Sequence, residues 1–296
     1  MDYIIETENL TKQFPGKLAV DHINMHIKKG DIYGFIGRNG AGKTTAMKMI
    51  AGLTKVTYGS IKLFGSSDLD AGRKKMGILI EDPGIYKNCT AFENLKRFSI
   101  LSGGTDDDIR EILKFVGLAD TGNRKAGAFS LGMKQRLGIA IALLGNPELL
   151  VLDEPINGLD PEGIKEIRDT LIKLNKEKGI TILISSHLLD ELAKITNVYG
   201  IINNGVLVEE ISAEDLRNQF SDSFKVRVDD PNRAVTVLKE AGLLEHYEIN
   251  GMTIKIYDHI HETDVINKCL VNADIKVYEI ELGGSFEQYF IERIGK

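Results

Sequence analysis

The chain has 296 residues, with 37 Lys and Arg against 43 Asp and Glu, so its formal net charge is −6. At about 100–200 residues per domain, this length predicts one large domain and a smaller one. Hydrophobic residues make up 43% and charged residues 27% of the chain, which is typical of a globular protein and excludes a disordered or collagen-like one. Cys89 and Cys269 are too few for a disulfide framework and favour a reducing compartment.

The sequence contains no apolar run near the length of about 20 residues that a membrane-spanning helix needs. The N-terminal residues also lack the basic and apolar segments of a secretory signal. Residues 213–296 carry 10 basic and 16 acidic residues, so this part holds the whole net charge of −6. Nucleic-acid-binding proteins usually have a basic patch, so we expect no nucleic-acid partner and interpret the acidic part as a solvated surface.

Up to about residue 210, short β-branched runs alternate with longer helical periodicities, which predicts an α/β fold around a parallel sheet. One helix begins with Asp160 as its N-cap and Pro161 at its first position, and it ends at Gly179. The predicted buried strands share a nearly continuous apolar sequence; they are Asp31–Ile36, Met76–Ile80, Leu149–Leu152 and Thr181–Ser185.

A predicted hairpin, Val198–Ile202 and Val206–Glu209, turns at Asn203-Asn204-Gly205 and closes the large domain. A helix near Ala213–Phe220 follows, and then a β-α-β-β-α-β pattern begins. We therefore expect two domains, residues 1–212 and residues 213–296, the second a small α+β domain of ferredoxin-like type. This fold alone implies no activity. The elements of the second domain are Phe224–Val228, Asn232–Ala241, a hairpin over Tyr247–Tyr257, Thr263–Val271, Lys276–Glu281, a turn at Gly283-Gly284-Ser285 and a last helix over Phe286–Ile294.

The clearest motif is Gly37-Arg38-Asn39-Gly40-Ala41-Gly42-Lys43-Thr44-Thr45, which matches G-x-x-x-x-G-K-[ST] between a predicted strand and a helix. Its glycines allow successive backbone N–H groups to point at phosphate oxygens, and the positive end of the following helix adds to their effect. Lys43 can reach the β- and γ-phosphates, and the Thr44 hydroxyl can bind Mg²⁺. The alternative is a glycine-rich turn with an incidental Lys-Thr pair.

Two acidic residues, Asp153 and Glu154, end the predicted strand Leu149–Leu152. They are expected at the carboxyl edge of the sheet, where ligands bind in such folds. We expect Asp153 to hold Mg²⁺ directly or through water, and Glu154 to act as the general base on the attacking water. By themselves, two acids at the end of a strand are a common surface feature.

The segment Ser130-Leu131-Gly132-Met133-Lys134-Gln135-Arg136 begins 23 residues before Asp153. With the two motifs above, it resembles the nucleotide-binding subunit of an ABC (ATP-binding cassette) transporter over about residues 3–210, and it is similar to the family signature L-S-G-G-Q-x-Q-R. In the family, this signature caps the γ-phosphate of ATP held by a second copy. The resemblance thus implies that Ser130 and Gly132 contact ATP from the partner copy, at a positive helix end. The alternative for this segment is a simple helix cap.

Three further residues gain a role from the resemblance. Asp160 ends a segment, Asn157-Gly158-Leu159-Asp160, that resembles the D-loop through which two copies sense each other, although it is also a plausible plain N-cap. His187 resembles the switch histidine that contacts the γ-phosphate and orients the catalytic water; a structural histidine is the alternative. Phe14 lies where the family places an aromatic ring that stacks on adenine, but an ordinary core residue remains an alternative.

Glu81 departs from the family pattern, which usually has Gln at this position. A carboxylate would bind Mg²⁺ more tightly, but its charge would repel the γ-phosphate. The signature also has Leu131 and Met133 in place of Gly and Gln. Together with the segment Leu137–Ala140, these departures resemble the branch that includes bacitracin-type and lantibiotic-type peptide and drug exporters.

The resemblance implies an ATP-driven motor in which two copies close head-to-tail around two ATP·Mg²⁺, with Lys43, Glu154 and His187 as catalytic residues. Motion would pass through the segment Tyr86–Phe98 to separate transmembrane permease subunits. This arrangement places the protein in the cytoplasm, on the inner face of the cell membrane. Two alternatives stay open: a soluble ABC ATPase of translation or DNA maintenance, and a regulatory module that holds nucleotide without productive hydrolysis. The first usually has two cassettes or a coiled-coil insert and a basic surface, which this sequence lacks.

Overall fold

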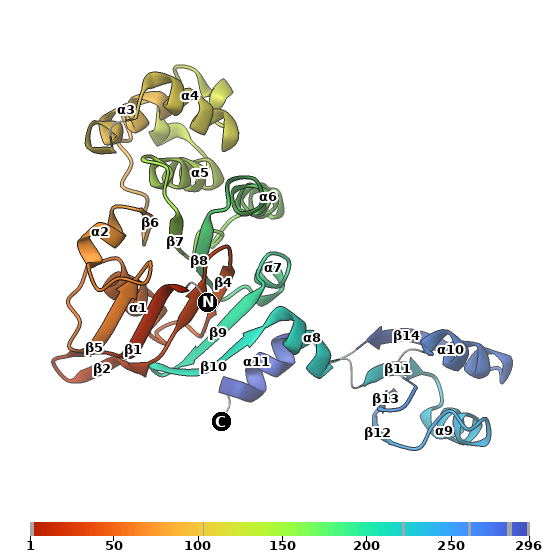
Figure 1. The fold of residues 1–296 in the computed structure, drawn as a ribbon. Coiled ribbons are helices and arrows are strands. Elements are labelled where there is room, and N and C mark those ends of the chain that lie inside the picture. The colour runs from red at the N-terminus through yellow and green to blue at the C-terminus, as the bar shows by residue number, and fades with distance from the viewer. Residues whose placement is uncertain (1–2, 103, 221–222, 260–261, 283–285, 295–296) are drawn as a thin grey trace. The chain divides into compact units, whose positions relative to one another are not determined.

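A computed structural model of the protein describes residues 3–102, 104–220, 223–259, 262–282 and 286–294 (Figure 1). The chain divides into two compact units, Met1–Ile211 and Ser212–Lys296. The turn predicted at Gly283-Gly284-Ser285 lies outside the described residues.

The first unit is built on a six-stranded sheet whose five strands from β9 to β6 run parallel. Every residue of β4, β7 and β8 is buried, as expected for parallel strands that are covered on both faces. The four predicted strands are confirmed to within one residue at each end. The order across the sheet is β10 (Val206–Ser212), β9 (Val198–Asn203), β4 (Ile32–Ile36), β8 (Thr181–Ser186), β7 (Leu149–Asp153) and β6 (Met76–Leu79).

A second, antiparallel sheet in this unit was not predicted. Its long strand β1 breaks the period-two alternation of buried and exposed residues, because the register shifts between Leu10 and Lys12 and again between Glu8 and Thr11. Such bulges hide a strand from pattern analysis. The strands are β1 (Tyr3–Phe14), β2 (Lys17–Ile23), β3 (His26–Lys28) and β5 (Tyr58–Leu63), and all three others pair with β1.

The helices of the first unit connect and cover these strands, and α3, α4 and α5 pack on one another while α5 contacts β6 (Figure 1). The predicted ends of α6 are confirmed: the Asp160 side chain accepts a hydrogen bond from the Gly163 N–H, and Gly179 is left-handed with φ of 67°. The helices are α1 (Lys43–Ile50), α2 (Leu69–Arg73), α3 (Ala91–Ser102), α4 (Asp106–Phe115), α5 (Leu131–Ala142), α6 (Pro161–Lys178) and α7 (Leu189–Ala193).

In the second unit, the elements follow the predicted β-α-β-β-α-β order. The antiparallel sheet has the order β12-β13-β11-β14, and the apolar sides of α9 and α10 share one core with it, as at Leu238, Ile266 and Phe224. The elements are α8 (Ala213–Phe220), β11 (Phe224–Val228), α9 (Pro231–Glu240), β12 (Tyr247–Asn250), β13 (Thr253–Ile256), α10 (Thr263–Asn272), β14 (Val277–Leu282) and α11 (Phe286–Ile294). Among the described residues of the whole chain, none of the helices is both long and apolar enough to cross a bilayer.

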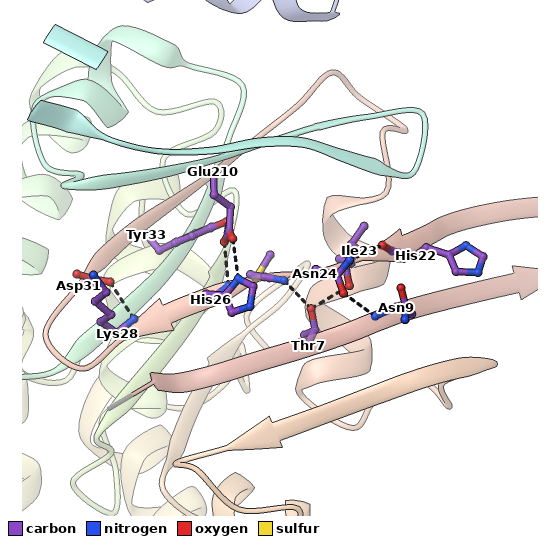
Figure 2. Close-up of polar contacts among 11 residues, drawn as sticks. Thr7, Asn9, His22, Ile23, Asn24, His26, Lys28, Asp31, Tyr33 and Glu210 are labelled. Atoms are coloured by element: carbon purple, nitrogen blue, oxygen red, sulfur yellow. Dashed lines mark hydrogen bonds and ion pairs between the residues drawn. The ribbon is translucent and has the colours of Figure 1, made fainter. Parts of the chain in front are cut away.

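Glu210, on β10, links this strand to β4 of the same sheet and to β3 of the antiparallel sheet (Figure 2). The hydroxyl of Tyr33 on β4 donates to Glu210 Oε1 at 2.8 Å, the backbone N–H of His26 on β3 donates to the same oxygen at 2.9 Å, and the His26 Nδ1 atom lies 3.0 Å from Oε2. Burial of the Tyr33 ring, together with the negative charge of Glu210, raises the pKa of the phenol well above its usual value. The Tyr33 hydroxyl is therefore neutral and stays a hydrogen-bond donor.

We expect Glu210→Ala to lower the free energy of unfolding of the first unit by about 1–3 kcal/mol, because the buried Tyr33 hydroxyl loses its acceptor. The change is measured by unfolding the protein in urea and following hydrogen exchange in peptides that contain β4. Glu8→Ala, which removes an exposed carboxylate on β1, is the control. If Glu210→Ala costs as much in a Tyr33→Phe background as in the unmodified protein, the hydrogen bond is not the cause.

Candidate nucleotide-binding site

The loop from Gly37 to Gly42 joins β4 to α1, and close backbone contacts require glycine at its first and last positions. A Cβ atom at Gly37 would lie 2.6 Å from the Ile202 carbonyl oxygen, and one at Gly42 would lie 2.5 Å from the Ala19 carbonyl oxygen. Gly42 also has a φ of 111° and is the N-cap of α1. Since glycine has no side chain to cap the helix, the first N–H groups of α1 are available to an anion.

A cavity of about 260 Å³ lies over this loop. It brings together most of the predicted phosphate-binding residues and the predicted base, and it adds Lys17, Ala19 and Asn157. Its lining residues are Lys17, Ala19, Asn39, Gly40, Ala41, Gly42, Lys43, Thr44, Thr45, Glu154 and Asn157.

Lys43 is nearly buried, with a side chain 6% exposed. Its Nζ atom donates to the Gly37 carbonyl oxygen at 2.7 Å and lies 3.4 Å from Glu154 Oε1. The ammonium group is thus held against the loop by two oxygen atoms. A phosphate group in the cavity would meet a lysine that is already positioned, which lowers the entropy lost on binding.

Asp153, at the end of β7, receives a hydrogen bond on each carboxylate oxygen. Thr44 Oγ1 donates to Oδ2 at 2.8 Å, and Ser185 Oγ donates to Oδ1 at 2.6 Å. A hydroxyl and a carboxylate side by side form an oxygen donor set that suits Mg²⁺, which is usually bound by one or two protein groups together with substrate phosphates. Among the described residues, no group of three or more His, Cys, Asp or Glu side chains could hold a metal ion.

Glu154 follows Asp153 with a φ of 49°, a conformation that is uncommon for a residue with a side chain. Its N–H donates to Ser185 Oγ at 2.9 Å. Its carboxylate lies between two partners, with Oε2 2.8 Å from His187 Nδ1 and Oε1 3.4 Å from Lys43 Nζ. The structure therefore brings the three predicted catalytic residues into direct contact.

Glu81, the predicted metal ligand on the loop after β6, is paired elsewhere. Its carboxylate is 66% exposed and lies 2.5 Å from Nζ of Lys48, one helical turn after Thr44 on α1. Like Glu154, it has a positive φ, here 63°. The described contacts join Glu81 to neither Thr44 nor Asp153.

The remaining predicted residues lie outside the cavity lining among the residues that the structure describes. Ser130 caps α5 by accepting a hydrogen bond from the Met133 N–H at 3.2 Å, and Asp160 caps α6, so both make the cap contacts that were weighed as alternatives. Phe14, at the end of β1, is 41% exposed, which contradicts its alternative as a core residue. The Lys12 Nζ atom lies 4.9 Å from the centre of the Phe14 ring.

Comparison with known proteins agrees with this geometry. The family model "ABC transporter" matches residues 20–157. The bacitracin transport ATP-binding protein BcrA of Bacillus licheniformis is 43% identical over 301 residues, covering 100% of this chain and 98% of that protein. The lantibiotic transport ATP-binding protein SrtF of Streptococcus pyogenes is 42% identical and covers 74% of this chain and 96% of its own length. This chain belongs to the ABC transporter ATP-binding family.

Solved structures support the same assignment. The protein cbiO1 of Clostridium perfringens, part of an ABC transporter complex, is 28% identical with a TM-score of 0.66 over 74% of this chain and 92% of its own. A dimeric ATP-binding cassette in a post-hydrolysis state, bound to ADP and phosphate, is 26% identical with a TM-score of 0.64 over 71% and 98%. The predicted ABC ATPase fold is confirmed. The protein is an ATP-binding subunit of an ABC transporter, and it hydrolyses ATP to drive transport.

Ser185 and Lys17 belong to the site but were not predicted from the sequence, and Asn157 was predicted only as part of the D-loop segment. Ser185 left a signal: it and Ser186 are polar residues at the carboxyl end of an otherwise apolar strand. Lys17 left none, since it lies on the unpredicted strand β2.

We expect Lys43→Ala to weaken ATP binding about 10–100-fold, because a hydrogen bond to a charged phosphate contributes about 1.5–3 kcal/mol. Titration with a fluorescent ATP analogue measures the affinity. Lys62→Ala, on β5, is the control and should bind as the unmodified protein does. Equal affinity for Lys43→Ala and the control would remove Lys43 from the phosphate site.

Proposed function

We propose that this protein powers the export of an antimicrobial peptide or drug through separate membrane subunits. One observation carries the proposal: the similarity to a bacitracin transport ATP-binding protein extends over the whole chain, including residues 213–296. The lantibiotic transport relative supports the same class of cargo. Both names describe transport of peptide antibiotics.

In the proposed cycle, residues 1–212 form the nucleotide-binding domain. Its loop (Gly37, Asn39, Gly40, Ala41, Gly42, Lys43, Thr44 and Thr45) binds the phosphates of ATP, with Phe14 on the adenine. Thr44 and Asp153 would hold Mg²⁺, and Glu81 would be a third ligand if its carboxylate left Lys48. When bound, Mg²⁺ would neutralise charge on the ATP phosphates. Glu154 takes a proton from the attacking water, and the contact of 2.8 Å with His187 orients its carboxylate for that step.

The proposed active unit is a head-to-tail pair of copies. Ser130 and Gly132 lie at the N-terminal end of α5, where helix N–H groups favour an anion. In the pair, this end would face the γ-phosphate bound by the second copy, and Asp160 would lie at the contact between the copies. Residues 213–296 form an accessory domain.

Contact with the membrane subunits is proposed for the segment Tyr86–Phe98. Tyr86 is 50% exposed, its ring lies 5.8 Å from that of Phe98, and the Arg97 guanidinium lies 5.1 Å from the Tyr86 ring centre. An exposed aromatic residue with a neighbouring cation is a common anchor in protein interfaces. Through this contact, the protein would sit on the cytoplasmic face of the membrane.

We expect Glu154→Gln to lower ATP hydrolysis about 100–10,000-fold, because the amide cannot accept the proton, while ATP binding persists. ATP should then hold two copies together. A steady-state ATPase assay and light scattering after gel filtration with ATP measure both effects. The control is Glu162→Gln, an exposed position on α6. Hydrolysis at the unmodified rate would show that Glu154 is not the base.

The cargo is tested in cells. Expressed with the membrane subunits that co-purify with it, the protein should raise the minimal inhibitory concentration of bacitracin or a lantibiotic. Glu154→Gln should not raise it, because its slow hydrolysis would limit export. Active ATPase without any change in resistance to either peptide class would contradict the proposed cargo and leave the transporter assignment intact.

A further inference from the structure

We propose that Ser185 is a positioning residue for ATP hydrolysis, holding Asp153 and Glu154 in a fixed relation to each other. The inference rests on the proposed roles of these two acids. Ser185 is fully buried near the end of β8, and it pairs directly with Asp153 in the register of the parallel strands β7 and β8.

The direction of both hydrogen bonds is fixed by chemistry. The Glu154 N–H can only donate, so the Ser185 oxygen accepts it at 2.9 Å. The Asp153 carboxylate, when ionised, can only accept, so the single hydroxyl proton of Ser185 points to Oδ1 at 2.6 Å. The buried Ser185 hydroxyl therefore joins the two consecutive acids, and these two hydrogen bonds fix the direction of its O–H bond.

For Asp153, the consequence is a fixed carboxylate plane. With Oδ1 held by Ser185 and Oδ2 directed to Thr44, the second oxygen faces the other proposed Mg²⁺ ligand. If Mg²⁺ replaces the Thr44 proton as the partner of Oδ2, the Ser185 bond can persist. Groups that orient a metal ligand in this way typically change metal affinity or activity 10–100-fold when they are removed.

For Glu154, the Ser185 hydroxyl stabilises an unfavourable backbone conformation, with a φ of 49°. A left-handed conformation costs a residue with a side chain about 1–3 kcal/mol and persists only where its surroundings hold it. The Ser185 hydroxyl supplies the shorter of two acceptors for the Glu154 N–H; the other is the Ser185 carbonyl oxygen at 3.2 Å. This backbone directs the carboxylate toward Lys43 and His187.

The same strand offers a matched control. Thr181, at the opposite end of β8, is also fully buried, and its hydroxyl also accepts a backbone N–H, that of Gly30, at 2.9 Å. Thr181→Val removes a comparable buried hydroxyl from the same strand. It separates a general loss of stability from a loss of positioning, because none of the described hydrogen bonds joins Thr181 to Asp153 or Glu154.

The experiment compares full-length Ser185→Ala, Ser185→Thr, Thr181→Val and the unmodified protein. For Ser185→Ala we expect kcat to fall about 10–100-fold and half-saturating Mg²⁺ to rise, with ATP affinity in EDTA changed less than about twofold. Without nucleotide, hydrogen exchange should become faster in the peptide that contains Glu154. Ser185→Thr, which keeps the hydroxyl, should restore both the exchange and most of kcat, and Thr181→Val should leave them unchanged.

Three outcomes would overturn the inference: unmodified kcat and exchange in Ser185→Ala, an equal loss of kcat in Thr181→Val, or a Ser185→Thr variant with restored exchange and no restored kcat. Failure of the proposed base assignment is distinguishable, because it appears as normal hydrolysis by Glu154→Gln. In that case, a shifted Mg²⁺ dependence and faster exchange in Ser185→Ala would still support the positioning of Asp153.

Discussion

The carboxylate of Asp153 is the point on which the site depends. Thr44 reaches it from α1 and Ser185 reaches it from β8, so three separate segments of the chain meet at one side chain. Because the acid is nearly buried, each of these hydrogen bonds is stronger than it would be in water, and a missing partner would leave a costly unpaired oxygen. The same contacts set the distance between the phosphate-binding loop and the residue that follows Asp153, Glu154.

Two acids predicted for the site, Glu154 and Glu81, have left-handed backbones, and they are held very differently. Glu154 is fixed by a buried hydroxyl and by Lys43 and His187, so its position is set before ATP arrives. Glu81 is held by an exposed ion pair with Lys48, and pairs of this kind contribute at most about 1 kcal/mol. Glu81 can therefore leave Lys48 at little cost, whereas Glu154 cannot easily leave its place. A weakly held Glu81 and a firmly held Glu154 suit the proposed cycle, in which Glu81 leaves Lys48 and Glu154 acts as the base.

The sequence predicts those parts of the structure whose signals lie within a few consecutive residues. The parallel strands were predictable because burial on both faces makes each one a short apolar run, and α6 because its caps, Asp160 and Gly179, are local signals. The loop Gly37–Thr45 was predictable because its chemistry allows few residue types. The antiparallel sheet was missed because bulges in β1 break the alternation, and Ser185 because its role exists only once β7 and β8 lie side by side. The polar end of β8 marks Ser185 as unusual, but no fixed spacing in the sequence shows that it pairs with Asp153.

The geometry also bears on how binding could produce movement. Ser130 and Gly132 lie at the N-terminal end of α5, and neither lines the cavity over the phosphate-binding loop of the same copy. A nucleotide in that cavity therefore has no contact with them within one copy. In the proposed pair, the γ-phosphate gains this second set of donors only when the copies close. ATP then binds the closed state more tightly than the open one, and that difference is the largest shift in population that ATP can cause. After hydrolysis, the γ-phosphate no longer joins the loop of one copy to α5 of the other. The nucleotide then binds the closed pair with less preference over the open pair.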